Sequence, residues 1–528
     1  MSRSLTWREA ALAAAVFVVV AGLSFGPLVI HGGFHLDDWS NGAEALYPPP
    51  GSHTFTRISE IAVFRPVLIL YVPLTYLVFG MHMWLHLAWA VGLGVAVSLL
   101  LYAILRTLEV PWVHAGFIGA LVLLFPWFDG IRYWVTGAQV SLSIAIMLLG
   151  LLLALRGLNR ASLKWHLGAA ALYLTSILTY EITLPLIAML GGLYVWRYGW
   201  RAGRIPWVID LVAVVIGGFW VGSHTERTKA GLSGDISHLG EIINGGAEIL
   251  GRTAIPLDGP HTTLALLILA VVFAVGVTRF VSRREPDAEP KSWDLRCWLL
   301  LGASGLAVAV LGWVIFIPAD PYYTPVIWGL TNRVNGLSGI GLVIIVYSAV
   351  GVLAQVLAMA LRRAETTVLI VTGCLALALG AGYVSVIRRH TGIWNSAYVA
   401  EASAMDRIKD RYPELPEGTT LFASGYPAYQ TLGVPILSST WDLRGMVQSL
   451  YQDGTLNAYP IIEGFSVECR SEGVALAGEG APDIPAVYGT ARLFDLPSGR
   501  SARPLNRHQC LAIVSNYRPG PFYLSYKY

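Results

Sequence analysis

The chain has 528 residues, of which 55% are hydrophobic and 13% are charged, and its formal net charge is +3. This composition lies outside the range of soluble proteins and predicts a polytopic membrane protein. The basic residues are scattered between apolar stretches, so we expect no nucleic-acid partner. No CxxC, HExxH, P-loop or GxSxG motif stands in a useful context, which argues against the common zinc, nucleotide and serine-hydrolase sites.

Apolar stretches of about 16–22 residues recur about eleven times, and each could cross a hydrocarbon core about 30 Å thick. The first is longer than a signal-peptide core, so it is taken as a membrane helix. The predicted fold is an all-α polytopic membrane protein, with spans at 9–30, 83–105, 112–128, 139–155, 166–180, 182–196, 207–223, 262–280, 297–318, 334–361 and 366–387.

The distribution of Lys and Arg predicts the orientation of these spans. With a cytoplasmic N-terminus, the cytoplasmic segments hold more basic residues than the opposite loops, although the opposite loops are longer. An odd number of spans then leaves the C-terminus outside. We expect a multi-pass protein of the bacterial plasma (inner) membrane, with its C-terminal part extracytoplasmic.

Two outer loops carry apolar sequence of their own. In loop 31–82, residues 64–80 are interpreted as a juxtamembrane or re-entrant helix at the outer surface, because an extra span would invert every later loop. In loop 223–261, apolar residues recur at helical spacing beside acidic ones, which predicts an amphipathic helix on the membrane face. The transmembrane domain is placed at 1–390.

The composition changes after the last span. Residues 392–412 predict an amphipathic helix that ends at Tyr412-Pro413. Cys469 and Cys510 would lie in an oxidising compartment, which predicts a disulfide. Residues 391–528 are therefore expected to form a small extracytoplasmic mixed α/β domain, with strand-like pieces at 419–424, 465–469, 486–496 and 509–515.

Two adjacent acids, Asp37 and Asp38, follow the first span. Charge is costly to bury at this depth, so a pair of carboxylates here indicates chemistry. The alternative is that they cap a short helix or are solvated in a loop. Adjacent residues of a helix point about 100° apart, so the two acids would divide the work rather than share a proton.

Four segments in the N-terminal part of the chain resemble, in order, motifs of the GT-C glycosyltransferases. The resemblance is greatest to the transmembrane O-mannosyltransferases, although the tetratricopeptide repeats that these normally carry are missing here. The Lys that the family has before Glu181 is also replaced, by Tyr180. The segments are 34–39, residues 64–66 with 77–80 and His86-Leu87, 134–137, and 180–185.

This resemblance implies transfer of a sugar from a polyprenyl-phosphate donor to a glycan, lipid or protein acceptor on the outer face. A phosphate leaves without help from a second acid, so one base is enough, and attack from the opposite face predicts inversion. The resemblance implies that Asp37 is this base. It implies that Asp38 positions the acceptor or a divalent cation, Mn²⁺ or Mg²⁺.

The departing phosphate needs cations directed at it. Arg65, Arg132 and Arg333 lie near span ends on the outer side, where a guanidinium can bind phosphate oxygens or simply snorkel to the interface. Glu181 stands between two apolar spans, where it faces a cavity or ties two helices together. His86, at a span start, is either a supporting site residue or an interfacial histidine.

Two other classes of function were weighed. A lipid or polysaccharide transporter or flippase should place ionisable residues near mid-span and show internal repeats. Here the acids lie at span ends on one face and no repeat is visible. A membrane scaffold that presents the C-terminal domain gives no reason for Asp37, Asp38 and Glu181 on one side. The glycosyltransferase is therefore favoured.

Overall fold

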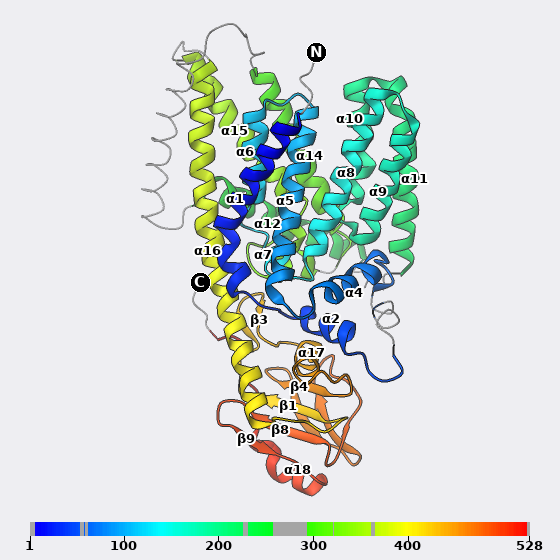
Figure 1. Cartoon of the computed structure of the whole chain (residues 1–528), viewed down its shortest axis with the longest axis vertical. Helices are drawn as coiled ribbons and strands as arrows, with labels where there is room; N and C mark the ends of the chain where they lie inside the picture. The colour runs from blue at the N-terminus through cyan, green and yellow to red at the C-terminus, as the bar shows by residue number, and fades with distance from the viewer. Residues whose placement is uncertain are drawn as a thin grey trace.

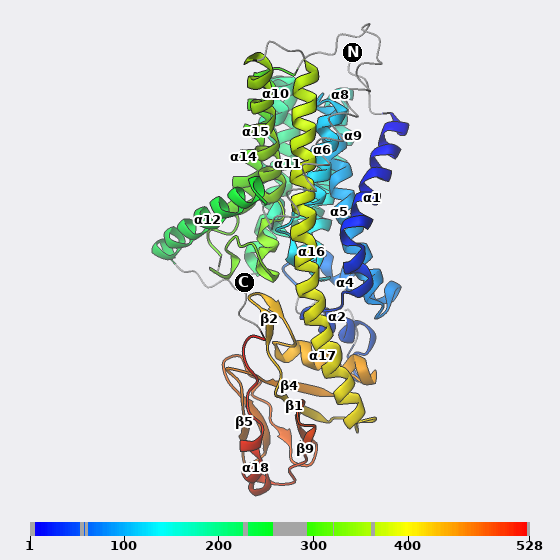
Figure 2. The ribbon, with the colours of Figure 1, turned by 90° about the vertical axis from the view of Figure 1, so that its left-hand side faces the viewer.

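The structure is a computed structural model that describes residues 6–52, 58, 62–224, 231–256, 293–319, 321–360 and 365–524. It consists of a bundle of long helices with a strand-containing C-terminal domain attached at one end (Figures 1 and 2). We call this end of the bundle the domain-side end and the opposite end the far end. The span predicted at 262–280 lies outside the described residues.

The bundle accounts for most of the predicted spans. Seven of the described helices are long and apolar enough to cross a membrane, and the chain is a multi-pass integral membrane protein. Helices α6, α9 and α10 are shorter, so the total of about eleven spans stays a prediction. The bundle helices are α1 (Trp7–His31), α5 (Met83–Thr107), α6 (Trp112–Leu123), α8 (Ala138–Arg160), α9 (Leu163–Thr179), α10 (Leu184–Tyr198), α11 (Trp200–His224), α14 (Leu295–Val314), α15 (Ser338–Ala360) and α16 (Glu365–Arg411).

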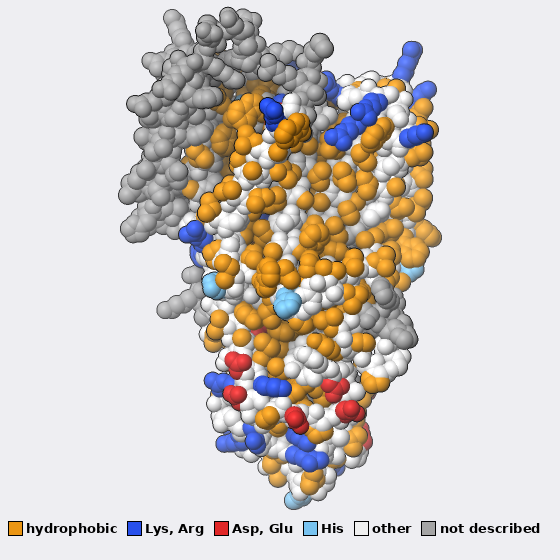
Figure 3. All heavy atoms as spheres, viewed as in Figure 1, with side chains coloured by type: hydrophobic (Ala, Val, Ile, Leu, Met, Phe, Trp, Pro, Cys, Tyr) orange, Lys and Arg blue, Asp and Glu red, His pale blue; other side chains and the backbone are white. Residues whose placement is uncertain are grey.

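The surface of the molecule shows the pattern of a protein embedded in a bilayer. Hydrophobic side chains cover the sides of the bundle in Figure 3. Lys and Arg gather at its far end, and acidic and basic side chains are mixed on the C-terminal domain (Figure 3). Apolar side chains on the outside of a bundle are stable in contact with lipid and costly in contact with water.

Among the described residues, six short elements and the longer helix α12 lie towards the domain-side end of the bundle. A helix is present where residues 64–80 predict one: α4 begins after Pro66 and is followed by Gly80, where φ is +58°, while its place at the outer surface stays a prediction. The predicted amphipathic helix is confirmed as α12, which buries Ile242 and exposes Ile243 and projects sideways in Figure 2. These elements are α2 (Asp37–Leu46), α4 (Val67–Phe79), α7 (Asp129–Arg132), η1 (Glu181–Thr183), α12 (Gly231–Ala254), η2 (Pro321–Tyr323) and η3 (Leu330–Asn335).

The last span and the first helix of the C-terminal domain are one continuous helix, not the two that the sequence suggests. α16 runs for 47 residues. It contains no proline, and Pro413 follows its last turn, so nothing interrupts its hydrogen bonds before Arg411. The expected domain boundary at 391 therefore falls inside a helix that connects the membrane to the C-terminal domain.

The C-terminal domain is built on a four-stranded sheet in the order β4-β1-β8-β9. β1 pairs in parallel with β4 and β8, and β9 is antiparallel to β8. The expected mixed α/β character is confirmed. The elements are β1 (Thr420–Ser424), β2 (Tyr429–Thr431), β3 (Val434–Pro435), α17 (Thr440–Tyr451), β4 (Asn457–Ile461), β5 (Ser466–Cys469), β6 (Gly473–Ala477), β7 (Ala486–Val487), β8 (Ala491–Asp495), β9 (Arg500–Ala502), α18 (Arg507–Ile513) and η4 (Val514–Asn516).

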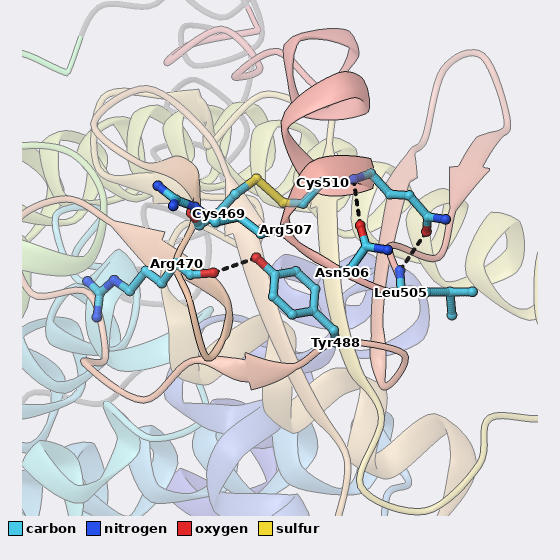
Figure 4. Close-up of a disulfide and its surroundings, with 8 residues drawn as sticks. Cys469, Arg470, Tyr488, Leu505, Asn506, Arg507 and Cys510 are labelled. Carbon is cyan, nitrogen blue, oxygen red and sulfur yellow. Dashed lines mark hydrogen bonds between the residues drawn. A yellow bond between two sulfur atoms is a disulfide. The ribbon is translucent and has the colours of Figure 1, made fainter.

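The strand predicted at 509–515 is wrong. These residues fall in α18 and η4, because the Asn506 side chain accepts a hydrogen bond from the backbone N–H of Gln509 and caps a helix. α18 carries Cys510, which is disulfide-bonded to Cys469 at the end of β5 (Figure 4). The two Cα atoms are 5.9 Å apart and the cysteines are 41 residues apart. Closing a loop of this size contributes about 3–4 kcal/mol through chain entropy.

Candidate active site

A sharp turn precedes the two acids of the first loop. Leu36 has a φ of +50°, which a leucine adopts at a cost of about 1–3 kcal/mol. α2 begins immediately after it, with Asp37 half-buried and Asp38 fully buried. As neighbours in the first turn of α2, the two side chains point in different directions and have different surroundings.

Asp38 is held entirely by the protein. One oxygen accepts hydrogen bonds from the backbone N–H and the hydroxyl of Thr136, both at 2.7 Å. The other accepts from the backbone N–H groups of His35 at 3.1 Å and Val135 at 3.2 Å. Burial raises the pKa of Asp38 to about 7, although these donors favour the ionised form. Asp38 thus fastens α2 to the turn before α8.

These contacts correct the role expected for Asp38. A carboxylate offers about four lone-pair positions, and four donors occupy them here. Asp38 therefore has no free position for an acceptor or a cation. Among the residues that the structure describes, no group of three or more His, Cys, Asp and Glu side chains could hold a metal ion. A need for Mn²⁺ or Mg²⁺ stays a prediction for assay.

Asp37 has one oxygen engaged and one available. The indole N–H of Trp441, from α17 in the C-terminal domain, donates to Oδ1 at 2.7 Å. Oδ2 forms no hydrogen bond with the described part of the chain. Burial raises the pKa of Asp37, while the Trp441 N–H and the positive charge of Arg333 partly oppose the rise. A half-buried carboxylate with a free oxygen is suited to accept a proton.

Arg333 lies on η3, in an aromatic cup. Its guanidinium carbon is 5.2 Å from the ring centre of Trp134, 5.5 Å from that of Tyr322 and 5.4 Å from that of Tyr323. It forms no ion pair with any carboxylate that the structure describes. Aromatic faces attract a cation without neutralising it. Arg333 can therefore offer its N–H groups to a phosphate near Asp37.

Arg65 and Glu181 form a pair that the sequence does not predict. Arg65 donates two hydrogen bonds to the Glu181 carboxylate, at 2.9 and 3.0 Å, and its guanidinium lies 3.9 Å from the ring centre of Tyr180. Glu181 therefore has a cationic partner from the loop that precedes α4. Arg65 and Arg333 share two neighbours, because Tyr180 and Tyr323 interact electrostatically with both guanidinium groups. Arg65 therefore lies near the site.

The other two predicted residues are structural. Arg132 is buried between Phe25 and Phe128 and donates to the carbonyl oxygens of Val122 and Phe125. It caps the end of α6, so its expected role in binding phosphate is wrong. His86 bonds the carbonyl oxygen of Gly80 at 2.9 Å, which makes it a support for the turn after α4.

Two residues of the site come from parts of the sequence that carry no resemblance. Glu401, on α16, accepts hydrogen bonds at 2.9 Å from His35 and from the indole of Trp39. The sequence could have indicated Glu401, because this acid lies on the same face of the helix as Ala397, Ala404 and Ile408, all of which are buried. The second is Trp441, whose helix start could be read from the Ser439-x-x-Asp442 capping box.

The four motif segments, far apart in sequence, meet at the domain-side end. The Thr136 bonds join the third segment to the first, and Tyr76 donates to the carbonyl oxygen of Asp38 from α4. The pair of Arg65 and Glu181 joins the second segment to the fourth. Every motif therefore contributes to one site.

Comparisons with known proteins give a likeness of fold. No family model matches the chain, and no curated protein matches it. Two solved structures to which it is similar are those of ArnT from Cupriavidus metallidurans, in the apo state and bound to undecaprenyl phosphate. Each is 17% identical to the chain and covers 85% of both chains, with TM-scores of 0.37 and 0.36. A TM-score below 0.5 carries no weight for substrate or reaction, so the proposal below rests on this chain's own residues.

Proposed function

We propose that the protein is an integral membrane glycosyltransferase of GT-C type that moves a sugar from a polyprenyl-phosphate donor to an extracytoplasmic acceptor. The observation that carries this proposal is the electrostatic interaction between Asp37 and Arg333: Asp37 has one carboxylate oxygen without a described hydrogen-bond partner, and Arg333 has no described carboxylate partner. A base beside an unneutralised guanidinium suits attack on a carbon that carries a phosphate leaving group.

The proposed reaction is a single displacement. The acceptor hydroxyl gives its proton to Oδ2 of Asp37 as its oxygen bonds to the anomeric carbon. The bond from that carbon to the phosphate oxygen breaks, and the phosphate leaves with the electron pair. One displacement from the opposite face inverts the configuration at the anomeric carbon.

Arg333 is the residue that we assign to the leaving phosphate. Its N–H groups can bind two phosphate oxygens at once, and they become more effective as negative charge develops in the transition state. Arg65 plays a secondary part, because two of its N–H groups are already given to Glu181. Tyr180 and Tyr323 interact electrostatically with both cations and can line the donor site.

The position of the site suits a lipid-linked donor. Asp37 begins α2, which lies at the domain-side end of the bundle (Figure 1), and the face of the bundle shown in Figure 3 is largely apolar. A long polyprenyl tail can therefore stay in the bilayer while its head group reaches the site. The basic far end suggests, by the positive-inside rule, that the far end is cytoplasmic and the C-terminal domain extracytoplasmic. The bacterial plasma membrane is the expected location.

The transporter alternative finds less support. Asp210 lies within α11 and is fully buried, as a transport residue would be. However, the hydroxyl of Tyr194 donates to Asp210 at 2.7 Å and also bonds the hydroxyl of Tyr173. These bonds join α9, α10 and α11, which is the role of an interhelical tie.

The proposal is tested by sugar transfer in bilayer nanodiscs. The purified protein is given undecaprenyl-phosphate mannose or undecaprenyl-phosphate glucose, radiolabelled in the sugar, together with an extract of bacterial envelope as acceptor. We expect label to leave the lipid phase with at least one donor. Transport of intact donor across sealed vesicles, without cleavage, would instead support the flippase.

A further inference from the structure

The C-terminal domain contacts the candidate site at two places. α17 packs along α2, and the turn between β2 and β3 meets the start of η3. The first contact reaches the helix that carries Asp37, and the second reaches the element that carries Arg333. Figure 2 shows α17 beside α2 at the domain-side end. One domain therefore touches both halves of the proposed chemistry.

Both contacts are close enough to require glycine. A Cβ on Gly445 of α17 would lie 2.4 Å from the backbone nitrogen of Ser40 in α2. A Cβ on Gly329, where φ is +70°, would lie 2.4 Å from the backbone oxygen of Gly433. That same oxygen accepts a hydrogen bond from the backbone N–H of Leu330 at 2.9 Å. Backbones in direct contact allow little relative movement.

We propose that the C-terminal domain is a working part of the active site, in which Trp441 is a positioning residue for Asp37. The inference rests on the proposed function. The indole N–H fixes Oδ1 and leaves Oδ2 for the acceptor hydroxyl, so the base is already oriented when the acceptor arrives. Trp441 is also 44% exposed, so it is accessible to an acceptor that approaches Asp37.

A donated hydrogen bond has a second effect, on proton affinity. An N–H that points at a carboxylate stabilises the charged form, so it lowers the pKa of that group. Without Trp441 the pKa of Asp37 should rise, and the base should stay protonated up to a higher pH. Packing against α17 alone predicts no such change.

The test compares the pH dependence of donor turnover in three proteins, each in nanodiscs, and Asp37→Asn is assayed beside them for activity. They are the native chain, Trp441→Phe, which keeps an aromatic ring and removes the N–H, and Tyr488→Phe as control. Tyr488 donates to the carbonyl oxygen of Arg470 near the disulfide, away from the site (Figure 4). The groups that face Asp37 from the neighbouring elements are unchanged in all three. They are Asp38 in α2, Tyr76 in α4, Arg333 in η3 and Asp442 in α17, with Glu401 of α16 behind them.

We expect the acidic limb of kcat/KM to move up by about one pH unit in Trp441→Phe, because a hydrogen bond to a charged group shifts its pKa by about that much. At pH values on the acidic side of the limb, turnover of Trp441→Phe should be about tenfold below that of the native chain. At higher pH, where the profile is flat, the two should differ little. Tyr488→Phe should match the native chain. Coincident native and Trp441→Phe profiles, with Asp37→Asn inactive, would overturn this inference alone. Native turnover in Asp37→Asn would overturn the proposed function itself.

Discussion

Whether Arg65 is engaged by Glu181 or free for phosphate can be decided by a double-mutant cycle. The two side chains are 13% and 3% exposed and share two charge-assisted hydrogen bonds. Removing either partner leaves the other charge buried, which costs about 3–5 kcal/mol. Arg65→Ala and Glu181→Ala should each lose about this much unfolding free energy. The double variant should lose less than their sum, with a coupling of about 2–4 kcal/mol.

The measurement is unfolding by SDS in mixed micelles, and the chain supplies a matched control. Arg252 and Glu248 form an exposed pair four residues apart on α12, with side chains 52% and 53% exposed. Such a pair should couple by only about 0.3–0.5 kcal/mol. If the coupling between Arg65 and Glu181 is no larger than in this control, the buried pair is refuted and Arg65 returns as a phosphate ligand.

Three further predictions follow from the site and its orientation. Arg333→Ala should weaken the binding of undecaprenyl phosphate about 10- to 100-fold, because a charge-assisted bidentate contact is lost. Thermophoresis measures this affinity, and Arg160→Ala, at the far end, is the control that should bind as the native chain does. Equal affinities of the two variants would remove Arg333 from the site. Gly445→Ala should force α17 away from α2 and slow donor turnover. Gly392→Ala is the control and should have no effect, because a Cβ at Gly392 meets nothing within 4 Å. Equal turnover rates in the two variants would contradict the close contact between α17 and α2. A cysteine placed at Ser52 should react with an impermeant thiol reagent in intact cells and one at Ser162 should not, and the reverse result would invert the orientation.

Sequence reasoning was strongest where local patterns decide the structure. The bundle helices follow from apolar length, and α4 and α12 follow from Pro66, Gly80 and amphipathic spacing. The prediction of a strand at 509–515 was wrong, because the side-chain cap at Asn506 starts a helix and outweighs the β propensity of these residues. The prediction of two separate helices in the region of α16 was wrong, because a change from apolar to amphipathic sequence does not end a helix that lacks proline.

Within the site, pairings over long sequence distances could not be read from the chain. Asp38 has the residue type of a catalytic site, yet Val135 and Thr136, 97 and 98 residues away, use its hydrogen-bonding capacity. Arg132 has the residue type of a phosphate ligand, yet it donates to the carbonyl oxygens of Val122 and Phe125 in the preceding segment. Trp441 lies 404 residues from Asp37 in sequence, and no local signal connects the two. Residue type was therefore a good guide to where the site is, and a poor guide to which members remain free to act.

The most direct test of the central claim is Asp37→Asn. Asparagine keeps the size of the side chain and can still accept the hydrogen bond from Trp441, but it cannot take a proton from the acceptor. We predict that transfer from the radiolabelled undecaprenyl-phosphate sugars falls by at least about 100-fold, while the affinity for undecaprenyl phosphate stays within about twofold. Transfer at the native rate by Asp37→Asn would contradict the proposed mechanism.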